Sequence, residues 1–208
     1  MRALEKRFRC QLLAASKLAF GICFCLSFAS TSRAQAFDVK LDKSRTKIEY
    51  SVDSTLHTVQ GTFKLKSGEI HFDTNSGKAT GLVTVDATSG DSGNKSRDKK
   101  MHQEILESQK YPDVIFTPQE VRGTFNPKQE SELDVSGLLR LHGSDHPITA
   151  KIVVQAPAGS QVLSTAHFDI PYVKWGMKDS STFFLHASDT VEINVEAWGQ
   201  ISTESSTR

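Results

Sequence analysis

Residues 93–116 read GNKSRDKKMHQEILESQKYPDVIF, and this is the one stretch of the chain whose pattern predicts a helix. Asn94 or Ser96 can cap its start, and Asp98 falls in the first turn, where the helix dipole favours an acidic side chain. Pro112 disfavours helical geometry at Tyr111, so we expect the helix to end there. A strand pattern begins directly after it. The stretch therefore predicts a single short helix inserted into a β-protein.

The predicted helix has one apolar side and a cluster of cations. Met101 and Ile105 are four residues apart and place a narrow apolar stripe on one face, which can be buried. Such a helix can lie across one end of a β-barrel. It is then either a plug with a solvated charged face, or the gate of a ligand cavity whose cations meet an anionic head group. The cations that gather at its start are Lys95, Arg97, Lys99 and Lys100, and the last three are the predicted head-group contacts.

From Phe37 onward, apolar residues recur mostly at every second position, which is typical of half-buried β-strands. Nine candidate strands follow from this pattern: 48–52, 59–65, 69–72, 83–87, 114–116, 133–141, 148–154, 166–170 and 191–197. Most connections are too short for parallel crossovers, so neighbouring strands should pair antiparallel. A sheet of this size must close or split into two layers to protect its edges. Gly61, Gly81 and Gly137 interrupt strand patterns and permit sharp bending, which favours an all-β antiparallel barrel over a sandwich.

The first 36 residues have the pattern of a signal peptide. A basic region is followed by a short apolar run, Leu18–Ala29, and by small residues at Ala34-Gln35-Ala36. The run spans twelve residues, fewer than the roughly 20 that a membrane-spanning helix needs. We therefore expect cleavage between Ala36 and Phe37, one domain over residues 37–201, a polar tail over 202–208, and a periplasmic or secreted protein without stable membrane insertion. An uncleaved N-terminal membrane anchor is the alternative.

Charge and cysteine content argue against two kinds of site in the mature chain. Six of the 25 Lys and Arg residues and one of the 24 acidic residues lie within residues 1–36, which leaves 19 basic and 23 acidic side chains and a net charge of about −4. A nucleic-acid partner therefore has no electrostatic basis. All three cysteines, at positions 10, 23 and 25, belong to the same segment. Neither a disulfide nor a thiolate site is expected, so the core alone must hold the fold.

No pattern in the sequence predicts catalysis or metal binding. His142 and His146 have the spacing that aligns two ligands on a helix, but Gly143 and Pro147 predict a hairpin turn there. The other five histidines are scattered, and neither a GxSxG elbow nor a phosphate-binding glycine loop occurs. We therefore expect no catalytic residue, no metal and no cofactor.

Several motifs together resemble the YceI-like polyisoprenoid-binding family, in order and over essentially the whole mature chain. They are Gly61-Thr62-Phe63, SGEIHFD at 67–73, NKSRD at 94–98, KYP at 110–112 with Ile115-Phe116 after it, and VSGLLRLHG at 135–143 with Pro147-Ile148 after it. The resemblance implies a lipocalin-like antiparallel β-barrel closed at one end by the short helix, a periplasmic location, and an elongated apolar pocket for an isoprenoid chain or a similar lipid. The chain departs from the family where Tyr172 and Lys174 replace an Arg and an Asp, although Trp175-Gly176 keeps the aromatic-glycine element.

The inward side chains would either line such a pocket or fill it as core, because a hollow barrel and a packed one share the same alternation. The resemblance favours the cavity. Trp175 could equally plug the mouth of the barrel. The predicted ligand-binding residues are Tyr50, Phe63, Phe72, Val83, Met101, Ile105, Phe116, Leu139, Phe168 and Trp175.

The sequence thus predicts a protein that holds an isoprenoid or other long-chain apolar lipid for transport, storage or sequestration, without catalysis. Two alternatives stay open. One is an enzyme that acts on an isoprenoid or quinone-type lipid, and the other is a ligand-free, stress-related module. A homodimer is also compatible with the sequence.

Overall fold

A computed structural model describes residues 35–157, 159–181 and 186–203 of the 208-residue chain. The predicted signal peptide, apart from its last two residues, lies outside the described residues, as do the three cysteines and the tail beyond Thr203. Within the described ranges, no helix is both long and apolar enough to cross a membrane. The chain there forms one antiparallel sheet and one helical segment.

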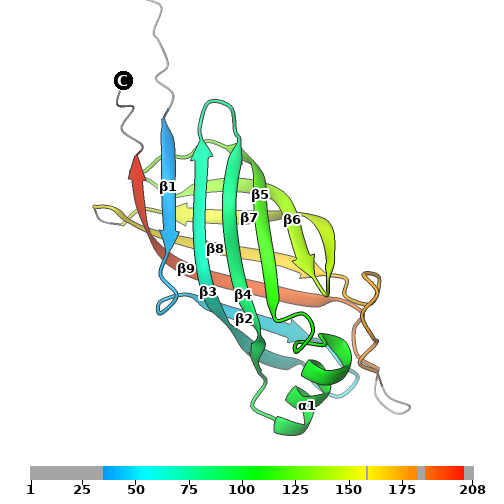
Figure 1. Cartoon of the computed structure of the whole chain (residues 1–208). Coiled ribbons are helices and arrows are strands. Elements are labelled where there is room, and N and C mark those ends of the chain that lie inside the picture. Colours follow the sequence, from blue (N-terminus) through cyan, green and yellow to red (C-terminus); the bar gives the residue numbers. More distant parts are fainter. Residues whose placement is uncertain (1–34, 158, 182–185, 204–208) are drawn as a thin grey trace, which may run out of the picture. The chain divides into compact units, whose positions relative to one another are not determined.

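Nine strands make up the sheet in the described part of the chain (Figure 1). They are β1 Ala36–Leu41, β2 Lys47–Val52, β3 Val59–Asp73, β4 Ala79–Asp91, β5 Asp113–Gly123, β6 Ser131–Leu141, β7 Ser144–Gln155, β8 Gln161–Ile170 and β9 Val191–Thr203. The helical segment consists of α1, Lys95–Lys100, continued by the π-helix η1, Met101–Ile105. All the paired strands run antiparallel, as the short connections predict.

The sheet closes on itself into a barrel. The order β3-β2-β9-β8-β7-β6-β5-β4 returns to β3 through the pairing of β3 with β4. β1 and β2 share one position in this ring, because each of them pairs with both β3 and β9. Closure pairs the sheet edges that would otherwise invite aggregation. The predicted fold class, an all-β antiparallel barrel with one short helix at an end, is confirmed.

Two strand predictions need correction. β1 is missing from the predicted strands, although Phe37 and Val39 alternate with polar residues and pair with the far half of β3. The segments 59–65 and 69–72, predicted as two strands, belong to the single strand β3. Ser67 and Gly68 lie within this strand, where the register with β4 shifts between Leu65 and Ser67. The small residues therefore accompany a bulge and not a break.

The strands place one face inward and the other in water. β6 shows this most clearly: Leu133, Val135, Leu139 and Leu141 are buried, while Glu132, Asp134 and Arg140 between them are exposed. Gly137 belongs to the inward set, and a Cβ there would collide with the backbone oxygen of Thr117 on β5. Glycine thus permits the close approach of two strands, as its place in the strand pattern predicts.

The start of α1 is fixed by three side chains. The Asn94 side chain caps the helix by accepting hydrogen bonds from the backbone N–H groups of Ser96 and Arg97, both at 3.1 Å. Asp98 accepts from the backbone N–H and the hydroxyl of Ser92, at 2.9 and 2.5 Å. The Arg97 guanidinium donates to the hydroxyl and carbonyl oxygens of the same serine, each at 2.8 Å. The helix is therefore tied to the end of β4.

The helix ends before the predicted stop at Tyr111. η1 finishes at Ile105, and Leu106 donates its backbone N–H to the carbonyl of Met101 at 2.8 Å. Glu107 follows with φ 45°, a left-handed conformation that cannot continue the helix. Pro112 lies beyond this point and is not what terminates the element.

The residues after η1 fasten the helix to the barrel. The Tyr111 ring packs on His142, with ring centroids 4.7 Å apart, and a Cβ at Gly143 would come within 2.6 Å of the same ring. His142 and Gly143, with φ 53° and 81°, form the two-residue turn between β6 and β7. This confirms the predicted hairpin. It also shows that the KYP and VSGLLRLHG motifs, distant in sequence, are in contact.

Candidate functional site

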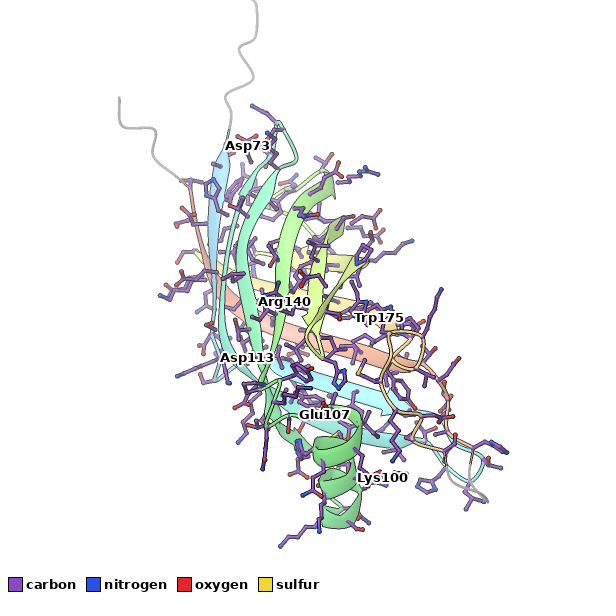
Figure 2. All side chains as sticks on the ribbon, turned by 45° about the vertical axis from the view of Figure 1, so that its right-hand side comes forward. Asp73, Lys100, Glu107, Asp113, Arg140 and Trp175 are labelled. Carbon is purple, nitrogen blue, oxygen red and sulfur yellow. The ribbon has the colours of Figure 1, made fainter. Side chains whose placement is uncertain are left out.

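One cavity of about 730 Å³ occupies the interior of the barrel. Its wall is predominantly apolar and takes side chains from all nine strands and from the helical segment. The lining runs from Lys100 and Met101, at the end where α1 lies, to Phe72, next to Asp73 near the opposite end (Figure 2). The inward side chains therefore surround open space instead of filling it.

The cavity has the size and character of a ligand site. Pockets for small ligands span roughly 300–1,000 Å³ and are mostly apolar with a few polar groups. An engineered void of only about 150 Å³ in a packed core already admits benzene. The interior of this barrel is several times larger than such a void and can accept an elongated apolar molecule.

Nine of the ten residues predicted to contact a ligand lie in the cavity wall: Tyr50, Phe63, Phe72, Val83, Met101, Ile105, Phe116, Leu139 and Phe168. The rings of Tyr50 and Phe63 pack together, with centroids 5.4 Å apart and planes tilted by 45°. The alternation of the strands and the stripe of the helix therefore located the wall. That these residues bind a ligand stays a prediction.

Trp175, the tenth, does not line the cavity. It is half-buried and stacks on His146, with ring centroids 4.0 Å apart and planes within 4°. His146 stands opposite Leu139 in the register of β6 and β7, near the turn between them. The imidazole lies on the inward face of the sheet beside Leu139, and the indole also packs against the inner cluster that contains Leu139 and Met177. The prediction that Trp175 lines the ligand cavity is wrong, whereas the alternative, a plug at the mouth of the barrel, stays a prediction.

Because His146 is partly buried where it stacks on Trp175, we expect the protein to lose stability in acid. The pKa of His146 is lowered because burial penalises the imidazolium, which the charge of Asp145 only partly offsets. Above pH of about 6.5 the imidazole is neutral in both folded and unfolded chains, and its contribution to stability is complete. As the pH falls through this value, the unfolded state takes up a proton that the folded state resists, so stability decreases until the lowered pKa is passed.

His146→Phe keeps an aromatic ring on Trp175 and removes this titration. We expect thermal denaturation of the wild type to show a larger decrease in Tm between pH 8 and pH 5 than that of the variant. Equal decreases in the two proteins would mean that protonation of His146 does not cause the loss of stability in acid, and that other groups do.

Polar side chains gather in the cavity wall at the end where the helix lies. This polar rim consists of Ser54, His57, Asn94, Ser96, Arg97, Lys100 and Ser180. Lys100 is half-buried and donates from Nζ to the carbonyl oxygen of Ser180 at 2.9 Å. An ammonium has three N–H donors, so this bond does not exhaust it. The rim can therefore meet a polar or anionic group at the mouth of an apolar tube.

Of the three cations predicted to contact a head group, two line the cavity and one does not, because of their positions on the helix. Arg97 and Lys100 are three residues apart, lie on the same side and line the cavity. Lys99 is exposed and does not line it, because adjacent helical residues point about 100° apart. The predicted role of Lys99 at the cavity is corrected. Burial and, next, the charge of Asp98 raise the pKa of Tyr50, so its hydroxyl stays a neutral group close to the rim.

Tyr172, singled out in the sequence only as a departure from the family pattern, organises the segment beside the rim. It is buried, lines the cavity, and its hydroxyl lies 3.0 Å from the Ser180 hydroxyl and donates to the carbonyl of Ser188 at 3.1 Å. Lys178 on the same segment forms an ion pair with Glu104 on η1 at 2.6 Å. Sequence reasoning missed Ser54, His57 and Ser180 as lining residues, because short loop segments carry no periodicity.

The described residues contain no group of three or more His, Cys, Asp or Glu side chains arranged to hold a metal ion. Both ring nitrogens of His102 are within hydrogen-bonding distance of other groups of the protein. They lie 3.0 Å from the Ser108 hydroxyl and 2.9 Å from the carbonyl oxygen of Gly90. His142 contacts Tyr111, and its Nε2 lies 3.5 Å from Glu107. These contacts hold the exit of the helix in place.

Comparison with known proteins gives relatives in sequence and in structure. The model of the YceI-like domain matches residues 39–198. Protein YceI of Escherichia coli O157:H7 is 33% identical over 149 residues, which cover 67% of this chain and 74% of the relative. Protein YceI of Salmonella agona is 32% identical over 145 residues, covering 65% and 72%.

Two solved structures share the fold. BcnA of Burkholderia cenocepacia superposes with a TM-score of 0.64 at 19% identity, over 76% of this chain and 98% of that one. A polyisoprenoid binding domain from Saccharophagus degradans, implicated in plant cell wall breakdown, gives a TM-score of 0.61 at 17% identity, over 79% and 98%. The barrel, its helical closure and the sequence match over residues 39–198 lead to one conclusion: the chain belongs to the YceI-like family.

Proposed function

We propose that this protein binds an isoprenoid or a similar long-chain apolar lipid inside the barrel. The observation that carries the proposal is the apolar cavity of about 730 Å³, with polar side chains concentrated at the end where the helix lies. An apolar chain fits the tube, and its polar end fits the rim. The structural relative from Saccharophagus degradans, described as a polyisoprenoid binding domain, supports the same class of ligand.

Burial of the chain supplies enough free energy for binding without a charged contact. Each buried methylene contributes about 0.8 kcal/mol, so roughly fifteen carbons contribute about 12 kcal/mol before the costs of association. If half of this is lost to ordering, about 6 kcal/mol remains, which corresponds to a dissociation constant between about 1 μM and 1 mM. Contacts of the head group with the rim add affinity and orientation.

The proposed role is transport, storage or sequestration of the lipid without turnover, in the periplasm or outside the cell. The export pattern of residues 1–36 supports the location. The predominantly apolar wall supports a binding role, because most of the groups that surround a guest carry no acid–base or nucleophilic chemistry.

Native mass spectrometry of protein purified gently from its host, followed by lipid extraction, tests the proposal. We expect a mass shift that disappears on extraction and a long-chain lipid in the organic phase. A chain that carries no lipid, and that takes up none from vesicles containing isoprenoid lipids, would contradict it. Conversion of an added lipid over time would instead establish an enzyme.

Lys100→Glu should weaken binding of a prenyl phosphate but leave binding of the corresponding prenyl alcohol nearly unchanged. The substitution replaces a cation in the cavity wall by an anion, which repels a charged head group. For a partly exposed site we expect a loss of about tenfold for the phosphate, or ~1.4 kcal/mol. Displacement of a fluorescent lipid measures both affinities.

Lys99→Glu is the matched control, because it makes the same charge change one residue away, outside the cavity wall. The control should have affinities close to those of the wild type. Equal weakening of phosphate and alcohol by Lys100→Glu would mean that the variant disturbs the bond to Ser180 and not a head-group contact.

A further inference from the structure

Three phenylalanine rings pack together at the end of the barrel opposite α1. Phe37 and Phe72 are neighbours across the pairing of β1 and β3, with ring centroids 5.3 Å apart and planes 21° apart. Phe125 meets both of them edge-on, at 5.1 and 5.7 Å, with interplanar angles of 83° and 82°. This aromatic trio is a compact cluster in which Phe37 and Phe72 are buried.

Residues of the trio line two cavities. A second cavity of about 220 Å³ is lined by Phe37, Phe72 and Phe125, together with residues of the connections that follow β3 and β5. Phe72 and Phe125 also line the main cavity, as do Val121 and Leu133. The same two rings thus border both open spaces.

We propose that the trio is a partition between the two cavities, that it sets the length of chain that the protein can bury, and that Phe125 is the residue that decides this length. The inference rests on the proposed function. A lipid whose polar end stays at the rim extends along the tube until its tail meets the trio. Carbons beyond that length must remain in water, so they contribute nothing to affinity. Without the partition the tail would continue into the second cavity.

Phe125 differs from its two partners in how it is held. Phe37 and Phe72 lie in paired strands, so their positions are fixed by the sheet. Phe125 follows the end of β5 in the connection to β6 and is only half-buried. It can therefore be truncated with less damage to the fold than either of the others, and its removal joins the two spaces.

The test uses a series of all-trans prenyl alcohols of increasing length, with affinities measured by displacement of a fluorescent lipid. For the wild type, affinity should rise with each isoprene unit up to a certain chain length and then stay constant. This chain length is the break in the series. In Phe125→Ala the break should move to a longer chain by at least one unit. That added unit should raise affinity by about tenfold or more, because its carbons now leave water.

Phe168→Ala is the matched control, since it removes an equal ring from the wall of the main cavity but does not touch the partition. An equal displacement of the break in this variant would overturn the inference, because total volume and not the closed end would then be limiting. An unchanged break in Phe125→Ala would overturn it as well. Phe125→Leu, whose folding is to be checked by thermal denaturation, is a second variant and should move the break by a smaller step.

The outcomes separate this inference from the function on which it rests. A wild type that binds prenyl alcohols with no break, or with a break that Phe125 does not control, keeps the lipid-binding function and removes the length limit. A wild type that binds no prenyl alcohol of any length removes the proposed function and the length limit together.

Discussion

Ala166→Trp is expected to weaken binding of a long-chain isoprenoid by about 100-fold while the barrel stays folded. Ala166 lies on β8 and lines the cavity, so the new indole would enter space that the ligand otherwise uses. If the ring displaces about four carbons of the chain, at about 0.8 kcal/mol each, the loss is about 3 kcal/mol. Titration with a prenyl alcohol measures the change in affinity.

The effect on stability distinguishes a hollow barrel from a packed one. Overfilling a packed core costs about 1–3 kcal/mol, because side chains and backbone must move aside. In the open space beside Ala166 the indole has room, so the free energy of unfolding should change by less than about 1 kcal/mol. Denaturant unfolding of the ligand-free protein gives this quantity directly.

Thr165→Trp is the matched control on the same strand. Thr165 is exposed and lies outside the cavity lining, so the same indole would be added to the outer surface of the barrel. Its affinity should equal that of the wild type. Normal binding by Ala166→Trp would show that the lipid does not occupy this part of the cavity, and unfolding of this variant would show that the interior has no room.

The strands could be predicted because their signal is local. In β6 every second residue is buried and most of these are apolar, while the charged residues Glu132, Asp134 and Arg140 lie between them and are exposed. Closure of the sheet was expected from the need to protect its edges. That β1 and β2 share one place in the ring could not be predicted, because it depends on which half of β3 each of them pairs with. Pairing between strands that are far apart in the sequence produces no pattern in the sequence of either strand alone.

The residues of the site could be predicted where they lie on regular strands or on the helix, and not elsewhere. Residues on regular elements, such as Phe116 and Met101, were placed in the wall because periodicity says which way they point. Trp175 was misplaced because it lies in the turn segment after β8, which has no periodicity, and its orientation depends on His146 of β7, which no local pattern reveals as its partner. The choice between a hollow and a filled barrel was also beyond the sequence, since it depends on how inward side chains meet across the ring.

Gly81→Ala is expected to lower the free energy of unfolding by about 3 kcal/mol, from two separate causes. Gly81 lies on β4 opposite Ile70 with φ 121°, a conformation that L side chains rarely adopt. A Cβ at this position would also collide with the backbone oxygen of Glu69 on β3, which cannot move aside as a flexible side chain would. For a domain of this size, the expected decrease in Tm is about 10 °C.

Gly93→Ala separates the two causes, because it introduces the backbone strain without the collision. Gly93 has φ 75°, and a Cβ there meets nothing within 4 Å. We expect this control to cost about 1 kcal/mol, the strain of a positive φ alone. The difference between the two variants then measures the contact between β3 and β4. Similar losses for Gly81→Ala and Gly93→Ala would mean that β4 shifts freely against β3. The barrel wall would then move to accommodate a single methyl group. A wall that moves so easily could not keep the shape of the cavity constant around a guest.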